Sequence, residues 1–330
     1  MKLGVLQFFS WPERRVPLET VFARALERIE IMDRAGYDAV WLAEHHFSSF
    51  SVCPSVHLMG TMAASRTKRL RIGTGVSLAP FYHPLRLAEE VALLDVLSGG
   101  RVNWGAGRGF ARVEFENFGV PPDESTSRFH EAVEIVLRAW SEERLSFAGN
   151  HFRFDGVEVL PKPLQKPRPP VWMAATSEFS IDWAAGQGFS ILMDPHSAHA
   201  DLGRKRRYYA EKLEAAGFSI EGRDLPMARL LALGDSEAEA EEVARRGAEW
   251  IVNSYFGAAH NPVGVKDPAA PGADPVQRYL DGVILHGTVD AVLDQILRLH
   301  QEIGLDYLLA APLSHRSFML LTEKILPRLP

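Results

Sequence analysis

The run Glu44-His45-His46-Phe47 is the first part of the sequence whose side chains could do chemistry, and it follows a short apolar run at residues 39–42. Adjacent residues at the end of a strand point to opposite faces, so both imidazoles are not expected to bind one metal ion. One imidazole that faces a pocket would act as a general base or donate to a negatively charged intermediate. Alternatively, both histidines hydrogen-bond neighbouring loops, and the residues alone leave the two interpretations open.

Arg108 stands between Gly107 and Gly109, directly after an apolar run at residues 102–106. A dinucleotide-binding fingerprint would need a third glycine at the position of Phe110, so that interpretation fails. The fixed, forked donors of a guanidinium suit a phosphate or a carboxylate, which makes Arg108 a candidate ligand for such a group. A surface ion pair is the alternative, and the sequence leaves it open.

Three hydroxyl side chains, Thr176, Ser177 and Ser180, follow the apolar run at residues 170–174, where a helix is expected to begin. Such hydroxyls cap a helix, and together with the free N–H groups of its first turn they form an anion site. Capping alone would explain any single hydroxyl. If the strands before Arg108 and Thr176 are neighbours in a barrel, the arginine and the hydroxyls converge on one phosphate, which favours the functional interpretation.

Gly73 and Gly75 lie near the end of a predicted strand at residues 70–78. Glycine permits the backbone to approach a flat ligand closely. Taken alone, however, the two glycines are better explained as relief of crowding inside a barrel.

The elements that must position these residues alternate between short apolar runs and longer amphipathic segments. Residues 18–35, for example, repeat apolar side chains at helical spacing, and Gly36 ends that helix. The predicted strands are residues 2–8, 39–42, 70–78, 102–106, 170–174, 189–193, 226–233 and 306–310. The predicted helices are residues 18–35, 55–65, 84–97, 128–140, 177–187, 200–216, 236–255, 289–303 and 318–326. This alternation predicts an α/β fold, a (β/α)8 TIM barrel, in which residues just past the strand ends share one pocket.

Two segments depart from the alternation. Residues 145–160 are aromatic and β-like around a Gly149-Asn150 turn, which predicts an inserted β-hairpin. Residues 257–275 are rich in proline and glycine, which predicts a long loop that is either a lid over the site or disordered. Because this segment precedes the last β/α unit, we favour the lid. No linker divides the chain, so residues 1–330 are expected to form a single domain.

Composition narrows the classes of protein that remain. The chain has 330 residues, 46% of them hydrophobic and 24% charged, and a formal net charge of -6. This mild acidity argues against a nucleic-acid-binding protein, which usually carries a basic excess. The single cysteine, Cys53, excludes an intrachain disulfide and a metal site of several cysteines. The apolar stretches are too short to cross a membrane and the N-terminus does not resemble a signal peptide, so we expect a cytoplasmic protein.

Several of these runs together resemble the bacterial luciferase-like flavin monooxygenases, and in particular the luciferase α subunit. The matching stretches are residues 36–47, 83–90 with 93–95, 99–109, and 176–180 with 183–185. The Glu-His-His-Phe motif, combined with a helix that starts at His83-Pro84, is specific to this family. Beyond Gly188 the similarity is diffuse, as is usual where members differ in substrate.

The resemblance implies roles for individual residues. It makes His45 the catalytic histidine near the reaction centre of the flavin, and it implies a non-prolyl cis peptide between Gly75 and Val76, under the isoalloxazine ring. It also implies that Glu89 lies near the flavin ring. The phosphate contacts that it implies are Arg108, Thr176, Ser177 and Ser180.

The resemblance further implies oxygenation of a small organic substrate. Reduced FMN from a separate flavin reductase would react with O2 to give a C4a-peroxyflavin, in a homodimer that binds neither nucleic acid nor membrane. Two alternatives remain: hydride transfer with the deazaflavin coenzyme F420 on the same fold, and a non-catalytic flavin-binding subunit. The chain departs from luciferase at Gly107, where luciferase has a reactive cysteine, and at Glu114, where it has aspartate. These departures argue against light emission and long-chain aldehyde specificity, and they leave flavin binding intact.

Overall fold

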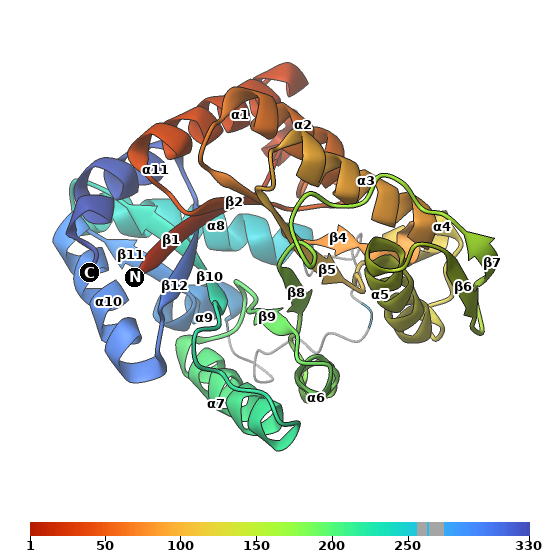
Figure 1. The fold of residues 1–330 in the computed structure, drawn as a ribbon. Helices are drawn as coiled ribbons and strands as arrows, with labels where there is room; N and C mark the ends of the chain where they lie inside the picture. The colour runs from red at the N-terminus through yellow and green to blue at the C-terminus, as the bar shows by residue number, and fades with distance from the viewer. Residues whose placement is uncertain (256–262, 264–273) are drawn as a thin grey trace.

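The computed structural model describes residues 1–255, 263 and 274–330 of the chain. In this part, ten strands form one curled sheet in the order β11-β10-β12-β1-β2-β3-β5-β8-β9, with β4 paired to β5 (Figure 1). Neighbouring strands in this sheet are parallel. A bridge between Met193 and Met227 links the segment after β9 to β10, so the sheet curls back on itself. The strands are β1 (Lys2–Gln7), β2 (Ala39–Leu42), β3 (Arg71–Thr74), β4 (Ser77–Leu78), β5 (Val102–Gly107), β8 (Val171–Ala174), β9 (Ser190–Leu192), β10 (Pro226–Leu233), β11 (Ile284–Gly287) and β12 (Tyr307–Pro312).

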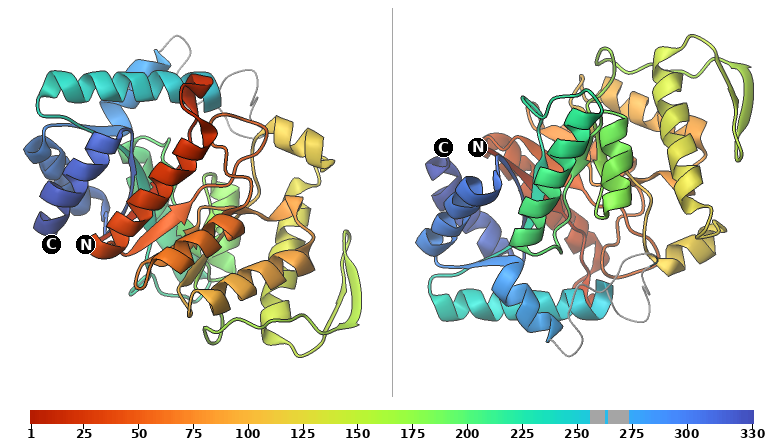
Figure 2. Two further views of the ribbon diagram at one scale, coloured as in Figure 1. Left: turned by 90° about the horizontal axis from the view of Figure 1, so that it is seen from above. Right: turned by 90° about the horizontal axis from the view of Figure 1, so that it is seen from below.

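Helices cover the outside of this sheet, and the two termini lie side by side (Figures 1 and 2). Helix α1 shows why they form: its apolar face buries Ala25, Ile29 and Met32, and Gly36 ends it in the left-handed conformation at φ 89°. The α-helices are α1 (Leu18–Ala35), α2 (Val56–Arg66), α3 (Pro84–Leu97), α4 (Arg112–Phe118), α5 (Ser125–Ser141), α6 (Glu178–Gly186), α7 (His199–Ala215), α8 (Glu237–Tyr255), α9 (Pro275–Gly282), α10 (Val289–Ile303) and α11 (His315–Leu320). Shorter helical turns are η1 (Pro12–Arg14), η2 (Ala79–Phe81), η3 (Leu321–Ile325) and η4 (Leu326–Arg328).

The structure confirms the mixed α/β fold and all the predicted strands, which are β1, β2, β3, β5, β8, β9, β10 and β12 in this sheet. One predicted strand is divided: residues 70–78 form β3 and β4, separated at Gly75 and Val76. The division follows from pairing, because β3 contacts both β2 and β5 whereas β4 pairs with β5 alone. The sequence did not predict α4, α9 or β11, each too short to display a repeat. The predicted last helix, residues 318–326, begins earlier, at His315.

The segment in which a hairpin was predicted contains β6 (Leu145–Ala148) and β7 (Arg153–Val157), which pair antiparallel as a separate two-stranded sheet. This sheet lies at the edge of the molecule far from the termini (Figure 1). Glu131 on α5 holds its turn by accepting hydrogen bonds from the backbone N–H groups of Asn150 and His151, at 2.7 and 3.0 Å. The predicted lid at residues 257–275 lies outside the described residues, apart from Val263, Asp274 and Pro275.

Apolar side chains fill both sides of the curled sheet. Along β2, Val40 and Leu42 belong to the layer beneath the helices, while Ala39 and Trp41 belong to a second cluster inside the curl. The Trp41 ring meets Trp172 edge-on at 5.2 Å, and a side chain at Gly73 would overlap it, so relief of crowding explains that glycine. Since the interior is packed, a ligand site has to lie at an end of the strands. None of the described helices is long and apolar enough to cross a membrane.

Candidate active site

Polar residues gather at the ends of the parallel strands. His45 follows β2, Arg108 follows β5 and Thr176 follows β8, while Asp194 and His196 follow β9. The carboxyl ends of parallel strands meet at one edge of the sheet, and in barrel-like folds this edge carries the catalytic residues. We therefore take this edge as the candidate active site.

His45 is buried beside a second buried titratable side chain. Its Nδ1 lies 3.6 Å from Oε1 of Glu114 on α4. Among the described residues, neither Nδ1 of His45 nor Oε2 of Glu114 has a hydrogen-bond partner, and buried polar atoms without partners often mark functional sites. A proton held on Nδ1 by the facing carboxylate leaves Nε2 as the basic nitrogen. The pair can therefore take up or give a proton at Nε2 of His45.

Aromatic rings surround His45. Phe50 and Phe110 meet the imidazole edge-on at 5.1 and 5.8 Å, and Phe8 stacks at 6.5 Å. Tyr255, the last residue of α8, packs against Phe50 and Phe110 at 5.4 and 4.5 Å. Apolar rings keep water away from a polar group, and electrostatic interactions there become stronger than in solvent. This environment suits proton transfer that must not leak to water.

His46 contacts a different set of groups. Its Nε2 lies 3.0 Å from Oε1 of the buried Glu44, whose Oε2 accepts a hydrogen bond of 3.0 Å from the hydroxyl of Tyr82. The backbone N–H of His46 donates to Glu114 at 3.0 Å. The two imidazole rings thus face different carboxylates, His45 that of Glu114 and His46 that of Glu44. No three His, Cys, Asp or Glu side chains within the described part are grouped to hold a metal ion.

Arg108 is half-buried and has no carboxylate partner among the described residues. Its guanidinium donates to the hydroxyl of Ser125 and to the carbonyl of Val263, both at 3.1 Å. Burial lowers the pKa of Arg108 because the charged form loses contact with water. The described residues therefore give no support to the alternative of a surface ion pair. A partly desolvated cation that meets no carboxylate in the described structure is a site that an anion would stabilise.

The hydroxyls near the start of α6 cap that helix. The Ser177 hydroxyl accepts from the backbone N–H of Ser180 at 3.3 Å, and the Ser180 hydroxyl accepts from the N–H of Ser177 at 3.1 Å. Thr176 is exposed just before them. Capping leaves the backbone N–H groups of Glu178 and Phe179 without a partner in the described structure, so the first turn retains two donors for an anion.

Pairing of β5 with β8 places Arg108 and Thr176 after neighbouring strands, since Ala106 is level with Met173. No hydrogen bond joins Arg108 to Thr176, Ser177 or Ser180 in the described structure. The expected convergence of these groups is thus one of neighbouring positions, not of direct contact.

The remaining predicted cofactor residues lie between β3 and β4, beside the strand that precedes Arg108, and on α3. The peptide between Gly75 and Val76 is cis. Val76 faces Gly107, where an added Cβ would come within 2.5 Å of its Cγ2. Glu89 is half-buried on α3 and makes no hydrogen bond or ion pair with another described residue. Its neighbour Glu90 instead contacts His57.

The contact between Gly107 and Val76 can be tested by placing a cysteine at position 107, the residue that the resemblance to luciferase implies there. Gly107→Cys is expected to lower the free energy of unfolding by about 1–3 kcal/mol, because the new side chain meets Val76 in a packed site. The double variant Val76→Ala/Gly107→Cys should recover most of that loss, as measured by urea denaturation. Gly186→Cys serves as a control, because a Cβ added at Gly186 would meet no atom within 4 Å. Equal losses in the single and double variants would contradict the contact.

The sequence did not predict a buried polar cluster of Asp194, His196, Arg229 and Tyr279. Tyr255 lies between this cluster and the aromatic rings around His45. The Tyr279 hydroxyl and Nδ1 of His196 are 2.9 Å apart, and the His196 ring lies 4.1 Å from that of Tyr255. Arg229, fully buried in β10, donates to the backbone carbonyl of Asp194 at 2.9 Å. Burial lowers the pKa of His196 to about 4 and that of Arg229 to about 10. His196 is therefore neutral near pH 7, whereas Arg229 stays charged.

The strand-end rule applied to His45 would also have selected Asp194 and His196, because both directly follow the predicted strand at residues 189–193. Arg229 gave no such signal, since it lies inside an apolar strand.

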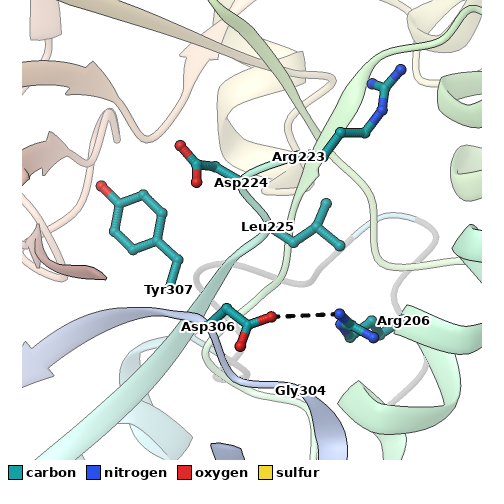
Figure 3. Close-up of a pocket in the computed structure, with 7 residues that line it drawn as sticks. All are labelled: Arg206, Arg223, Asp224, Leu225, Gly304, Asp306 and Tyr307. Atoms are coloured by element: carbon teal, nitrogen blue, oxygen red, sulfur yellow. Dashed lines mark ion pairs between the residues drawn. The ribbon is translucent and has the colours of Figure 1, made fainter. Parts of the chain in front are cut away.

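A small cavity lies at the opposite end of the sheet, where β10 and β12 begin (Figure 3). Its volume is about 20 Å³, and Arg206 and Asp306 approach each other across it at 3.6 Å. Such a volume holds about one water molecule. The cavity is thus too small for a flavin or an organic substrate, and it lies away from His45 and Arg108.

The family described as luciferase-like monooxygenase matches residues 1–307, so the chain belongs to the luciferase-like monooxygenase family. Among its relatives, the uncharacterized protein y4wF of Sinorhizobium fredii is 35% identical over 71% of this chain and 69% of its own length. The oxygenase component of the flavin-dependent trigonelline monooxygenase of Acinetobacter baylyi is 30% identical over 72% of this chain. The match spans 66% of that relative's length.

Solved structures agree on the fold. The monooxygenase RslO1 of Streptomyces bottropensis matches with a TM-score of 0.86 at 28% identity, over 99% of both chains. The oxygenating constituent of 3,6-diketocamphane monooxygenase of Pseudomonas putida, in complex with FMN, has a TM-score of 0.81 at 20% identity, over 100% of this chain and 99% of its own. The F420-dependent tetrahydromethanopterin reductase of Methanopyrus kandleri has a TM-score of 0.77 at 18% identity, over 100% of this chain and 99% of its own.

Proposed function

We propose that this chain is the oxygenase component of a two-component flavin-dependent monooxygenase, which takes reduced FMN from a separate flavin reductase and oxygenates a small organic substrate. The observation that carries this proposal is the buried His45–Glu114 pair at the carboxyl ends of the strands, ringed by aromatic side chains. The trigonelline monooxygenase relative, named as an oxygenase component, supports the two-component arrangement.

The residues at this edge fit FMN. Arg108 offers a half-buried guanidinium that lacks a carboxylate partner in the described part, and the first turn of α6 offers two backbone N–H donors, both suited to a phosphate. Gly75 and Val76 present backbone without a large side chain between these donors and His45. We propose that Arg108, Thr176, Ser177 and Ser180 hold the phosphate end, and that Gly75, Val76 and Glu89 lie along the ring system.

Reduced FMN supplies the two electrons with which one oxygen atom of O2 enters the substrate and the other leaves as water. The chain's own residues have three tasks. Glu114 holds a proton on Nδ1 of His45, so that Nε2 can deliver a proton to, or accept one from, the reacting oxygen. Phe50, Phe110 and Tyr255 exclude water from His45. Arg108 orients the cofactor from its phosphate end.

An F420-dependent hydride transferase is the second candidate, because F420-dependent enzymes share the fold. A non-catalytic flavin-binding subunit is the third, and the retained His45 and Arg108 speak against it. Binding separates the first two. In anaerobic titrations, reduced FMN should bind and F420 should not; binding of F420 alone would overturn the proposal.

Reaction with oxygen supplies the second part of this test. After anaerobic loading with reduced FMN, the protein is mixed with O2 in the presence of trigonelline or a cyclic ketone as the first probe substrates, chosen from the names of the similar proteins. Oxidised flavin should then appear more slowly than with free FMN, and hydrogen peroxide should fall short of the FMN oxidised. Immediate oxidation with one peroxide per FMN argues against oxygenation.

We further propose a cytoplasmic homodimer that pairs through α2 and α3. These helices expose apolar side chains that a monomer would leave in water, and the exposed fraction of Leu58 reaches 74%. The others are Met62, Leu93, Val96 and Leu97. Sedimentation at micromolar concentration should give the mass of two chains. We also propose that the curled sheet is a (β/α)8 barrel, with the β6–β7 hairpin as an insertion.

A further inference from the structure

Outside the proposed catalytic pair, two buried side chains and one half-buried carboxylate form a continuous relay of hydrogen bonds. Nε2 of His57 on α2 lies 3.0 Å from the hydroxyl of Ser77 on β4, and Nδ1 of His57 lies 2.9 Å from Oε2 of Glu90 on α3. Ser77 is fully buried and His57 is 4% exposed. Arg86 donates to the other carboxylate oxygen of Glu90 at 2.7 Å, so the relay ends in an ion pair near the surface.

The contacts fix the direction of the hydrogen bonds. An ionised carboxylate can only accept hydrogen bonds, so Nδ1 of His57, 2.9 Å from Oε2 of Glu90, carries the proton and donates. In the neutral imidazole the other nitrogen is then an acceptor. Nε2 of His57 therefore accepts from the hydroxyl of Ser77.

The order Ser77, His57, Glu90 is that of a nucleophilic triad, but nucleophilic attack does not fit the surroundings. A nucleophile must reach its substrate, whereas the Ser77 hydroxyl has no exposure to solvent. A positioning role fits better, because Ser77 directly follows Val76. The next residue is anchored as well: the backbone N–H of Leu78 points to Oε2 of the buried Glu44 at 3.4 Å.

We propose that His57 is a positioning residue for FMN: oriented by Glu90, it holds Ser77 and thereby fixes the Gly75–Val76 segment against the flavin ring. This inference rests on the proposed function. Burial of the polar side chains of Ser77 and His57 between α2, α3 and β4 costs free energy that apolar residues would not, unless their hydrogen bonds are made. Here they are made, and the strand that they fix, β4, directly follows Gly75 and Val76.

Two substitutions of His57 separate its hydrogen bond to Ser77 from its hydrogen bond to Glu90. His57→Gln places an amide near the position of Nε2 and keeps a partner for Ser77, while His57→Asn places one near Nδ1 and keeps only the contact with Glu90. Ser77→Ala removes the hydroxyl alone. The matched control is Ser98→Ala, which deletes a buried hydroxyl at the opposite end of the sheet, where it accepts from the N–H of Arg101 at 3.2 Å.

The readout is the dissociation constant of reduced FMN, with thermal melting of the unliganded protein measured alongside. Ser77→Ala and His57→Asn should each weaken FMN binding about tenfold, the size of one lost hydrogen bond at a buried site, whereas His57→Gln should stay within about twofold of the native chain. A structural role alone would lower the melting temperature of all three and of Ser98→Ala without this order of affinities.

The outcomes separate this inference from the proposed function. If the native chain binds FMN and all variants bind it equally, His57 is not a positioning residue. If the native chain binds no FMN, the proposed function falls and the inference falls with it. Ser77→Ala and His57→Asn break the same hydrogen bond from opposite ends, so one folded variant suffices for the test.

Discussion

His45→Ala should lower the yield of oxygenated product by about 10²–10⁴-fold, the contribution typical of a positioned acid or base, while FMN affinity stays within about twofold. The imidazole lies at the carboxyl end of β2, where Nδ1 faces Glu114 at 3.6 Å and no hydrogen bond to a described residue ties up Nε2. Truncation removes the proton carrier and leaves the candidate phosphate ligands untouched. Product formation should therefore be lost without loss of the cofactor.

The measurement is a single turnover of reduced FMN with O2 and the probe substrate, in which product and hydrogen peroxide are quantified together. Peroxide per FMN should rise toward one in His45→Ala, because oxygen that is not transferred leaves as peroxide. His300→Ala is the control: this histidine lies in the last turn of α10, where its Nδ1 contacts the carbonyl of Leu305, at the other end of the sheet. Native yields of product from His45→Ala would remove the proposed role.

Glu114→Gln refines the same prediction. The amide keeps an oxygen for the backbone N–H of His46, but it removes the negative charge that favours a proton on Nδ1 of His45. We expect a smaller loss of product than in His45→Ala. A double variant that is no worse than His45→Ala alone would show that Glu114 acts through His45.

The sequence was sufficient to predict the mixed α/β fold because its hydrophobic period is clear. Strands such as β2 are continuous apolar runs, and α1 repeats Ala25, Ile29 and Met32 on one face. Helix α4 has no such repeat: of its seven residues only Glu114 and Phe115 are buried, and one of these is charged. An element whose buried face is polar cannot be found from hydrophobic periodicity.

The strand-end rule located His45 and Arg108 because strand order in a parallel fold decides which residues are neighbours. The rule could not predict which side chains of different elements hydrogen-bond to one another. The Ser77–His57 hydrogen bond joins β4 to α2, and the pairing of Tyr279 with His196 joins residues 83 positions apart. The resemblance singled out Glu89, yet it is Glu90 that contacts His57, because adjacent positions on a helix face different directions.

The capping serines show the same limit. The sequence left open whether Ser177 and Ser180 cap α6 or bind an anion, and the structure confirms the cap. The two functions are compatible, because the cap engages the N–H groups of Ser177 and Ser180 and not those of Glu178 and Phe179. The anion site therefore stays a prediction, and it depends chiefly on Arg108.

Arg108→Ala should weaken FMN binding about 10- to 100-fold and leave riboflavin binding nearly unchanged, because a charge-assisted hydrogen bond to phosphate contributes about 1.5–3 kcal/mol. Riboflavin is the same ring system without the phosphate, so the ratio of the two affinities isolates the end of the cofactor that Arg108 touches. The substitution also removes the donors to Ser125 and Val263. Any general loosening that follows would weaken both ligands alike.

Two further variants sharpen this test. Arg108→Lys keeps the charge but not the fork, and should retain part of the preference for FMN over riboflavin. Arg144→Ala, in the exposed turn region before β6, removes a donor to the carbonyl of Gly156 and should leave both affinities unchanged. The lowered pKa of Arg108 supports the expected direction, since a cation that burial destabilises gains most from an anion brought beside it. If Arg108→Ala bound FMN and riboflavin as the native chain does, the phosphate would have to lie elsewhere, and the first turn of α6 would be the next place to test.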